Sequence, residues 1–134
     1  MSWLMTRTDR SLQEIESDDW GDPASATTRL SAEALRLRRT PVGDLSTEDL
    51  RLLIGQQIGL DTLIPIAART LAVDPLTEGD LYPGDLLGAV LRVDPGFWAR
   101  HPALRARIQE IVGRLPDPTP RELGPGLDRF LGRD

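Results

Sequence analysis

The residues with the clearest potential for chemistry lie in the acidic segment EGDLYPGD, residues 78–85. Its three carboxylates, Glu78, Asp80 and Asp85, could act as general base and acid in a hydrolase, with His101 as partner. They could also bind a metal ion, but their spacing matches no calcium loop, which needs more oxygen ligands and a bidentate glutamate at a fixed offset. No histidine, cysteine or serine constellation accompanies them, so we predict no catalytic residue, bound metal or cofactor.

The same segment has a structural interpretation. Pro83, Gly84 and Asp85 precede the apolar run LLGAVL, a pattern typical of the entry to a short buried helix. An acid at a helix start satisfies free N–H groups and suits the positive end of the helix dipole, so we expect Asp85 to be a cap or a first-turn charge. Glu78 and Asp80 then remain as candidate contacts for a basic partner.

A second acidic cluster surrounds Trp20 in the segment SLQEIESDDWGDP. Its acids are Glu14, Glu16, Asp18, Asp19 and Asp22. Tryptophan is enriched in binding hot spots, and acids steer basic partners. Alternatively, Trp20 folds back over the core while the acids stay solvated. Trp98, beside Phe97, is expected in the core.

Charge and composition limit the possible partners. Twenty-one acids and sixteen arginines give a net charge of −5, which opposes attraction to nucleic acid and anionic lipid and favours a basic partner. Arg36, Arg38 and Arg39 could suggest nucleic-acid binding, but arginines at a helix end also suit its negative pole. We therefore predict no direct nucleic-acid partner and no membrane partner.

Length and residue usage indicate a small cytoplasmic protein. The 134 residues suit one domain, and the absence of cysteine excludes disulfides and thiolate chemistry. The first residues lack the apolar region of a signal peptide, and no apolar run is long enough to span a bilayer. We expect a single helical domain over residues 10–115, a flexible segment over residues 1–9, and a proline-rich tail over residues 116–134. The tail could dock a short helix through Leu127, Phe130 and Leu131.

Helical periodicity dominates the chain, and no stretch alternates like a strand. One helix is predicted to begin after Ser46, capped with Asp49, and to end with Gly59 at its C′ position. The next should start at Asp61 as cap, hold Pro65 in its first turn, and be central because it is apolar over much of its circumference.

Further helices are predicted over residues 102–115, 28–38 and 11–17, the last with Ser11 and Glu14 at capping-box spacing. The predicted fold class is all-α: a compact bundle of about five to six short helices joined by turns rich in Gly and Pro, without a substantial sheet.

Three segments, taken in order, resemble a known family: LQEIESDDWG, LSTEDLRLLIGQQIGLDTLIPIAARTL and EGDLYPGDLLGAVLRVDPGFW. They are similar to the small all-helical immunity proteins of contact-dependent growth inhibition (CDI) systems, over residues 12–115. We expect the residues that form the family motif to be structural, because members of the family bind different toxins. In this sequence they are Leu50, Arg51, Ile54, Gly55, Gln56, Tyr82, Pro83, Gly84, Asp85, Leu86, Leu87 and Trp98.

The resemblance implies inhibition by binding. An immunity protein holds its cognate toxin domain inactive, often by covering the active site, and performs no reaction. Many such toxins are nucleases with basic grooves, so we expect the interface at the acids around Trp20, together with Glu78 and Asp80 if they project from the same side. The alternatives are, in order, a helical adaptor without a toxin, a hydrolase, and a nucleic-acid-binding regulator.

Overall fold

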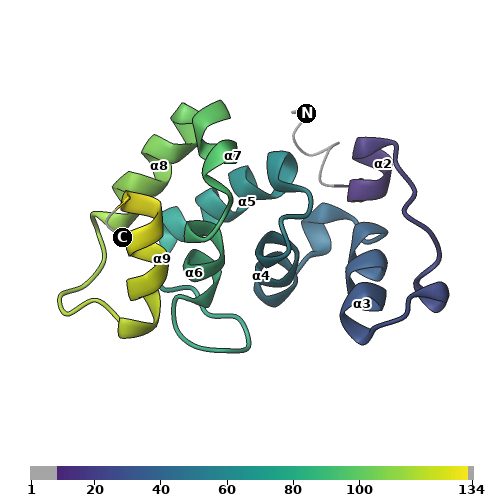
Figure 1. The fold of residues 1–134 in the computed structure, drawn as a ribbon, viewed down its shortest axis with the longest axis horizontal. Helices are drawn as coiled ribbons and strands as arrows, with labels where there is room; N and C mark the ends of the chain where they lie inside the picture. The colour runs from purple at the N-terminus through teal and green to yellow at the C-terminus, as the bar shows by residue number, and fades with distance from the viewer. Residues whose placement is uncertain (1–8, 133–134) are drawn as a thin grey trace.

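Eight α-helices and three 3-10 turns make up residues 9–132, the part of the chain that the computed structural model describes (Figure 1). The α-helices are α2 (Leu12–Glu16), α3 (Arg29–Arg38), α4 (Thr47–Gly55), α5 (Leu60–Val73), α6 (Asp85–Leu91), α7 (Pro95–Arg100), α8 (Pro102–Val112) and α9 (Gly124–Leu131). The turns are η1 (Pro23–Ser25), η2 (Val42–Asp44) and η3 (Arg121–Leu123). Within this range the only β-type pairing is an isolated bridge between Ser11 and Pro41, so the prediction of an all-α fold is confirmed.

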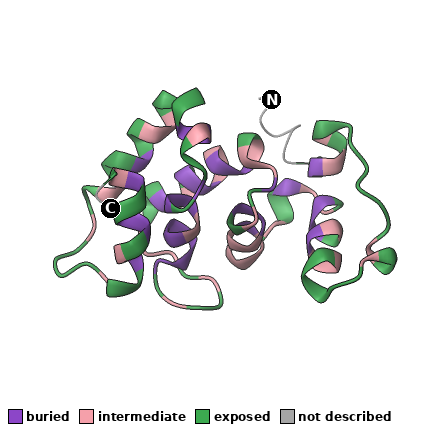
Figure 2. Ribbon diagram, in the orientation of Figure 1, coloured by how far each residue is buried: buried purple, intermediate pink, exposed green. Residues whose placement is uncertain are grey.

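The helices follow one another along the long axis of the molecule. Figure 1 shows α2 and α3 at one end, α8 and α9 at the other, and α4, α5 and α6 between them. Leu63, Ile64 and Leu71 of α5 are completely buried, which confirms that this apolar helix is central. Figure 2 shows buried positions gathered along α5 and α6 and exposed positions along the outer segments.

Local side-chain caps start several of these helices. Ser46 accepts a hydrogen bond from the Asp49 N–H at 3.1 Å, and the Asp49 carboxylate accepts one from the Ser46 N–H at 2.9 Å. Ser11 and Glu14 form the same reciprocal box at the start of α2. Both predicted capping boxes are therefore confirmed, and each satisfies two backbone donors that a helix N-terminus leaves free.

The connection between α4 and α5 differs from the prediction. The left-handed residue after α4 is Gln57 (φ +62°), whereas Gly59 (φ +65°) is the N-cap of α5, so the assignment of Gly59 to a C′ position was wrong. Asp61 is likewise not the cap, because the Gly59 carbonyl already accepts the N–H groups of Thr62 and Leu63. The sharp reversal at Gly59 lets α5 begin earlier than its sequence pattern indicates.

Pro65 consequently lies inside α5 rather than in its first turn. A proline at this position deprives the carbonyl of Asp61 of its usual intrahelical donor. Asp61 is exposed, so water can satisfy that carbonyl and the helix continues through the proline.

The chain beyond residue 115 returns to the body of the protein. Leu123, Leu127 and Phe130 are buried and belong to the same hydrophobic core as α5 and α6. Helix α9 packs against α6, where the Gly126 backbone comes close to Leu91. The flexible segment expected over residues 1–9 falls, except for its last residue, outside the described residues.

We predict that alanine substitutions at two nearby glycines have opposite effects on stability. A Cβ at Gly59 would lie 2.6 Å from a methyl carbon of the fully buried Leu12, and the residue has a positive φ, so Gly59→Ala should destabilise the fold by about 2–4 kcal/mol. Gly55 is helical with no atom near its Cβ position, so Gly55→Ala should stabilise it by about 0.5–1 kcal/mol. Denaturant unfolding measures both, and shifts of the same sign would contradict the assigned geometry.

Candidate functional site

The carboxylate of Asp85 organises the acidic loop of residues 77–84. Asp85 is only 2% exposed, and its two oxygens accept hydrogen bonds from the N–H groups of Gly79 (2.6 Å) and Leu81 (3.0 Å). It occupies the first position of α6, which confirms a first-turn charge, but the N-cap is Gly84 (φ +88°), so Asp85 is not the cap. Its hydrogen bonds hold the loop and not the first N–H groups of α6.

Glu48 and Arg51 of α4 complete this arrangement. Arg51 donates to Glu48, and its Nε lies 3.9 Å from an Asp85 oxygen, while Glu48 also accepts the Asp80 N–H at 3.0 Å. Hydrogen bonds from the Arg51 guanidinium lower the pKa of the Glu48 carboxyl, and Glu48 in turn raises the pKa of Arg51. We call Glu48, Arg51 and Asp85 the loop clamp, because they attach the loop of residues 77–84 to α4 and to the start of α6.

Two glycines allow the loop of residues 77–84 to pack closely against α4 and α6. A Cβ on Gly79 would lie 2.7 Å from a Glu48 oxygen, and one on Gly88 would lie 2.8 Å from the Tyr82 hydroxyl. The sequence prediction missed both Glu48 and Gly79. The spacing of three residues between Glu48 and Arg51 on one helix was the available signal for Glu48.

The motif residues fall into three groups by burial. Leu50, Ile54, Gly84, Asp85, Leu86, Leu87 and Trp98 are buried, whereas Arg51, Gln56 and Tyr82 are half-buried and Gly55 and Pro83 are exposed. Most of the motif thus contributes to the core or to the loop clamp. Gly55 is different, because neither its backbone conformation nor a neighbouring atom requires glycine there.

A buried arginine supports the loop around Trp20. Arg38 of α3 is 1% exposed; it donates to the Glu16 carboxylate and to the Asp18 carbonyl, and its guanidinium lies 3.9 Å from the centre of the Trp20 ring. The Trp20 indole N–H donates to the Asp18 carboxylate at 3.0 Å. We call residues 16–22 the Trp20 loop.

Trp20 folds back over Arg38 but keeps part of its surface exposed. One part of its side chain covers Arg38, and the residue remains 48% exposed. An aromatic ring that is already ordered but still partly exposed loses little conformational entropy when a partner covers it. The geometry thus suits an anchor for a partner.

The remaining acids of this cluster are exposed but locally bonded. Asp19 lies 3.6 Å from Arg39 and accepts the Gly21 N–H, and Asp22 accepts the Ala24 N–H at the start of η1. Glu14 accepts from the backbone and side chain of Ser11, and these hydrogen bonds lower its pKa.

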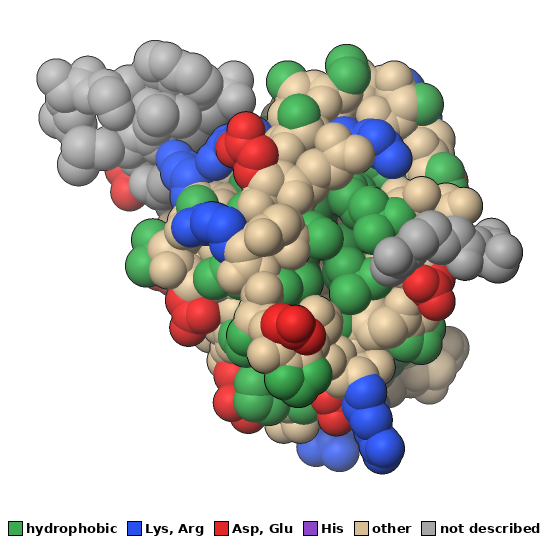
Figure 3. All heavy atoms as spheres, turned by 90° about the vertical axis from the view of Figure 1, so that its left-hand side faces the viewer, with side chains coloured by type: hydrophobic (Ala, Val, Ile, Leu, Met, Phe, Trp, Pro, Cys, Tyr) green, Lys and Arg blue, Asp and Glu red, His purple; other side chains and the backbone are tan. Residues whose placement is uncertain are grey.

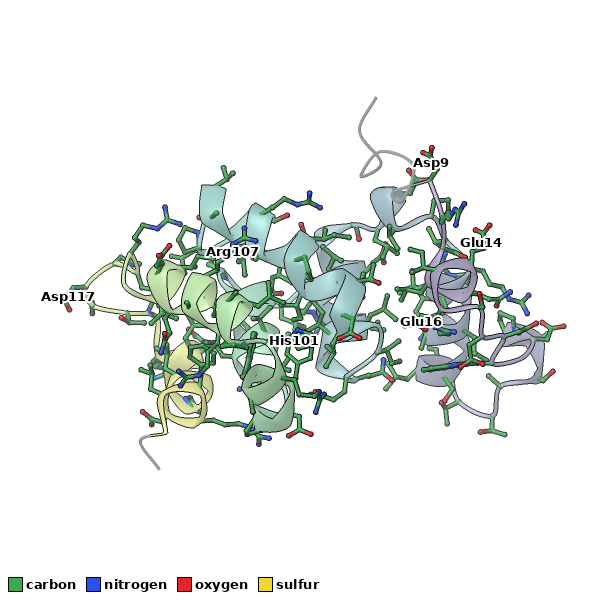
Figure 4. All side chains as sticks on the ribbon, turned by 90° about the horizontal axis from the view of Figure 1, so that it is seen from above. Asp9, Glu14, Glu16, His101, Arg107 and Asp117 are labelled. Atoms are coloured by element: carbon green, nitrogen blue, oxygen red, sulfur yellow. The ribbon has the colours of Figure 1, made fainter. Side chains whose placement is uncertain are left out.

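The two acidic regions do not meet. Glu78 and Asp80 are exposed on the loop beside α4, and Figure 1 shows α3 and α4 between that loop and the Trp20 loop. Figure 4 shows Glu14 and Glu16 at one end of the molecule and Asp117 at the other. A partner contacting both acidic regions must therefore extend across α3 and α4.

The structure does not bring His101 together with Glu78, Asp80 and Asp85, the residues that a hydrolase would use. His101 stacks on Phe97 with ring centres 4.3 Å apart, and its Nε2 lies 3.3 Å from Asp61 of α5. Asp85 instead accepts hydrogen bonds from the backbone of the loop, and Glu78 and Asp80 are exposed on that loop. Across residues 9–132, no three histidine, cysteine or acidic side chains are grouped to hold a metal ion.

The arginines of α3 do not form a continuous basic face. Arg36 pairs with Glu33, Arg39 lies beside Asp19, and Arg38 is buried under Trp20. The nucleic-acid alternative required such a face on this helix. Among the described helices, none has the length and apolar character needed to cross a bilayer.

Comparison with known proteins gives one match. Residues 14–108 match a family model described as CDI immunity proteins, in agreement with the resemblance over residues 12–115. No curated protein and no solved structure matched the chain.

We expect Asp85→Ala to destabilise the fold by about 2–4 kcal/mol, because it leaves the Gly79 and Leu81 N–H groups without their acceptor and removes the negative charge beside Arg51. Asp80→Ala, in the same loop, should change stability by less than about 0.5 kcal/mol, because its exposed carboxylate is not part of the clamp. Urea unfolding of both variants makes the comparison. Equal losses would show that the clamp does not hold the loop.

We expect Arg38→Met to release the Trp20 loop while the helices remain folded. Without the guanidinium, the Asp18 carbonyl and the Trp20 ring lose their support, so amide hydrogen exchange at Asp18 and Gly21 should accelerate by about tenfold or more. Arg36→Met is the matched control, since Arg36 is exposed and pairs only along its own helix. An unchanged Trp20 indole N–H signal in the NMR spectrum of Arg38→Met would contradict this role.

Proposed function

The chain belongs to the family of CDI immunity proteins, which bind and neutralise a cognate toxin, and we propose that it does so by non-covalent occlusion of a basic nuclease domain. On this proposal the protein performs no reaction. It covers the substrate groove of the toxin, and its carboxylates take positions that nucleic-acid phosphates would occupy.

The observation that carries this proposal is the uneven distribution of charge. Residues 9–39, which include α2 and α3, contain seven acids and five arginines, and residues 40–94, which include α4 to α6, contain nine acids and three arginines. Residues 95–132, which include α7 to α9, contain four acids and six arginines. Figure 3, which views the α8 and α9 end, shows acidic and basic side chains interspersed around hydrophobic ones. The negative charge therefore lies over α2 to α6, and the α7 to α9 end carries a net positive charge.

The proposed interface is centred on the Trp20 loop. Trp20 serves as the apolar anchor, and the acids beside it, Glu14, Glu16, Asp18, Asp19 and Asp22, supply the negative rim. This combination of a rigid aromatic residue and surrounding charge favours a tight and fast-forming complex with a basic protein. Glu78 and Asp80 form a second proposed contact, on the other side of α3 and α4.

We expect the Asp18→Asn, Asp19→Asn double variant to associate with the toxin about three- to tenfold more slowly at low salt, with the difference disappearing at high salt. Asparagine keeps an acceptor oxygen for the Trp20 and Gly21 N–H groups, so the loop should stay in place. Stopped-flow binding to an inactivated toxin domain encoded beside this protein's gene measures the rate.

The matched control removes the same charge from the opposite end. Glu110→Gln, Asp117→Asn should leave the association rate nearly unchanged, because both residues are exposed and lie away from the proposed interface. Glu110 belongs to α8, at the end opposite α2 and α3 in Figure 1, and Figure 4 shows Asp117 at that same end. Equal slowing by the two double variants would place the interface elsewhere. Failure of the unmodified protein to bind the toxin and protect cells from it would refute the proposed function and favour an adaptor.

A further inference from the structure

An open groove lies between the two acidic regions. It has a volume of about 590 Å³ and is bounded by the start of α3, by α4, by the loop of residues 77–84, by α6 with the following Arg92, and by Glu122 of η3. Its lining residues include Leu30, Leu52, Gly55, Gln56, Leu81 and Tyr82. Arg51 and Asp85 of the loop clamp also line it, so the groove is built on the most firmly fixed part of the loop.

Two exposed leucines line this groove. Leu30 is 52% exposed and Leu81 is 61% exposed, although both side chains are apolar. They come from different elements, α3 and the clamped loop, and the groove runs between these elements. Exposed apolar side chains beside a concave surface are typical of a site that a partner covers.

Gly55 keeps the groove open. Gly55 is the last residue of α4, where glycine costs less than it does in a helix interior. The φ of Gly55 is not positive, and no atom from another part of the described chain lies within 4 Å of where its Cβ would be. The missing side chain leaves space in the groove for an external group.

The surroundings of the groove identify the chemistry of its occupant. Leu81 follows the exposed Asp80, and Leu30 belongs to the same helix as Arg38, which supports the acidic Trp20 loop. A partner that contacts both acidic regions would carry basic residues and would extend across α3 and α4, two of the elements that border the groove. The apolar residues that it meets there, Leu30 and Leu81, would be matched by an apolar side chain of its own.

We infer that the groove receives a large apolar side chain of the toxin domain, flanked on the toxin by basic residues that face the two acidic regions. This inference rests on the proposed function and deepens it. The acids then govern how fast the complex forms, while the groove and its leucines govern how slowly it dissociates. Arg51 and Asp85 act here as positioning residues, because they fix the wall that carries Leu81.

The first experiment fills the groove. Gly55→Trp should weaken binding of the purified, inactivated toxin domain by about 100-fold, through faster dissociation, while the unfolding transition is preserved. Ala106→Trp, at an exposed position of α8 remote from the groove, is the matched control and should bind like the unmodified protein. Unchanged affinity of a folded Gly55→Trp protein would overturn the inference.

A second experiment removes the leucines and does not depend on the bulky variant folding. The Leu30→Ser, Leu81→Ser double variant should dissociate about 10- to 100-fold faster. Val73→Ser is its control, because Val73 is even more exposed, at 88%, but lies outside the groove. If the leucine variant dissociates normally while loss of Asp18 and Asp19 still slows association, the groove inference fails and the proposed function stands. If the unmodified protein does not bind the toxin, both fail.

Discussion

The arrangement of this protein depends on a buried carboxylate that holds a loop. Asp85 begins α6 inside the core, where an unpaired charge would be very costly, and it is compensated by two backbone N–H groups and by the neighbouring Arg51. Because those N–H groups belong to the preceding loop, the compensation fixes the loop at the same time. Glu48 ties the same loop to α4, so α4, the loop and α6 form one unit on which α9 then packs.

A second buried charge performs the same task at the other end. Arg38 lies in the core of the α2 and α3 region, and its hydrogen bonds go to Glu16 and to the Asp18 carbonyl, both in the Trp20 loop. In both places an ionised side chain on a helix orders a neighbouring irregular segment. The helices thereby supply rigidity, and the two ordered loops supply the exposed residues available to a partner.

The parts predictable from the sequence are those set by local chemistry. The capping boxes at Ser11 and Ser46 need only residues three apart, and the buried faces of the helices follow from apolar periodicity, so the all-α class could be inferred. The family resemblance rested on the same local segments. The start of α5 was misplaced because a glycine between two helices can serve either of them, and the left-handed Gln57 gave no compositional signal.

The candidate site was less accessible to sequence reasoning, because its contacts join distant parts of the chain. Arg51 and Asp85 are separated by more than thirty residues, and Arg38 contacts a loop about twenty residues earlier. An arginine in the last turn of a helix ordinarily points to solvent, so the burial of Arg38 could not be predicted from its position in the sequence. The groove arises only when α3, α4 and the clamped loop come together.

The separation of charge along the long axis also makes the molecule an electric dipole, with its positive pole at α7 to α9 and its negative charge over α2 to α6. In the field of a positively charged partner, such a dipole experiences a torque that turns the negative pole forward before the surfaces touch. The net charge of −5 sets the strength of the attraction, but the asymmetry determines which end arrives first. The rotational search that slows the docking of two specific patches is shortened accordingly.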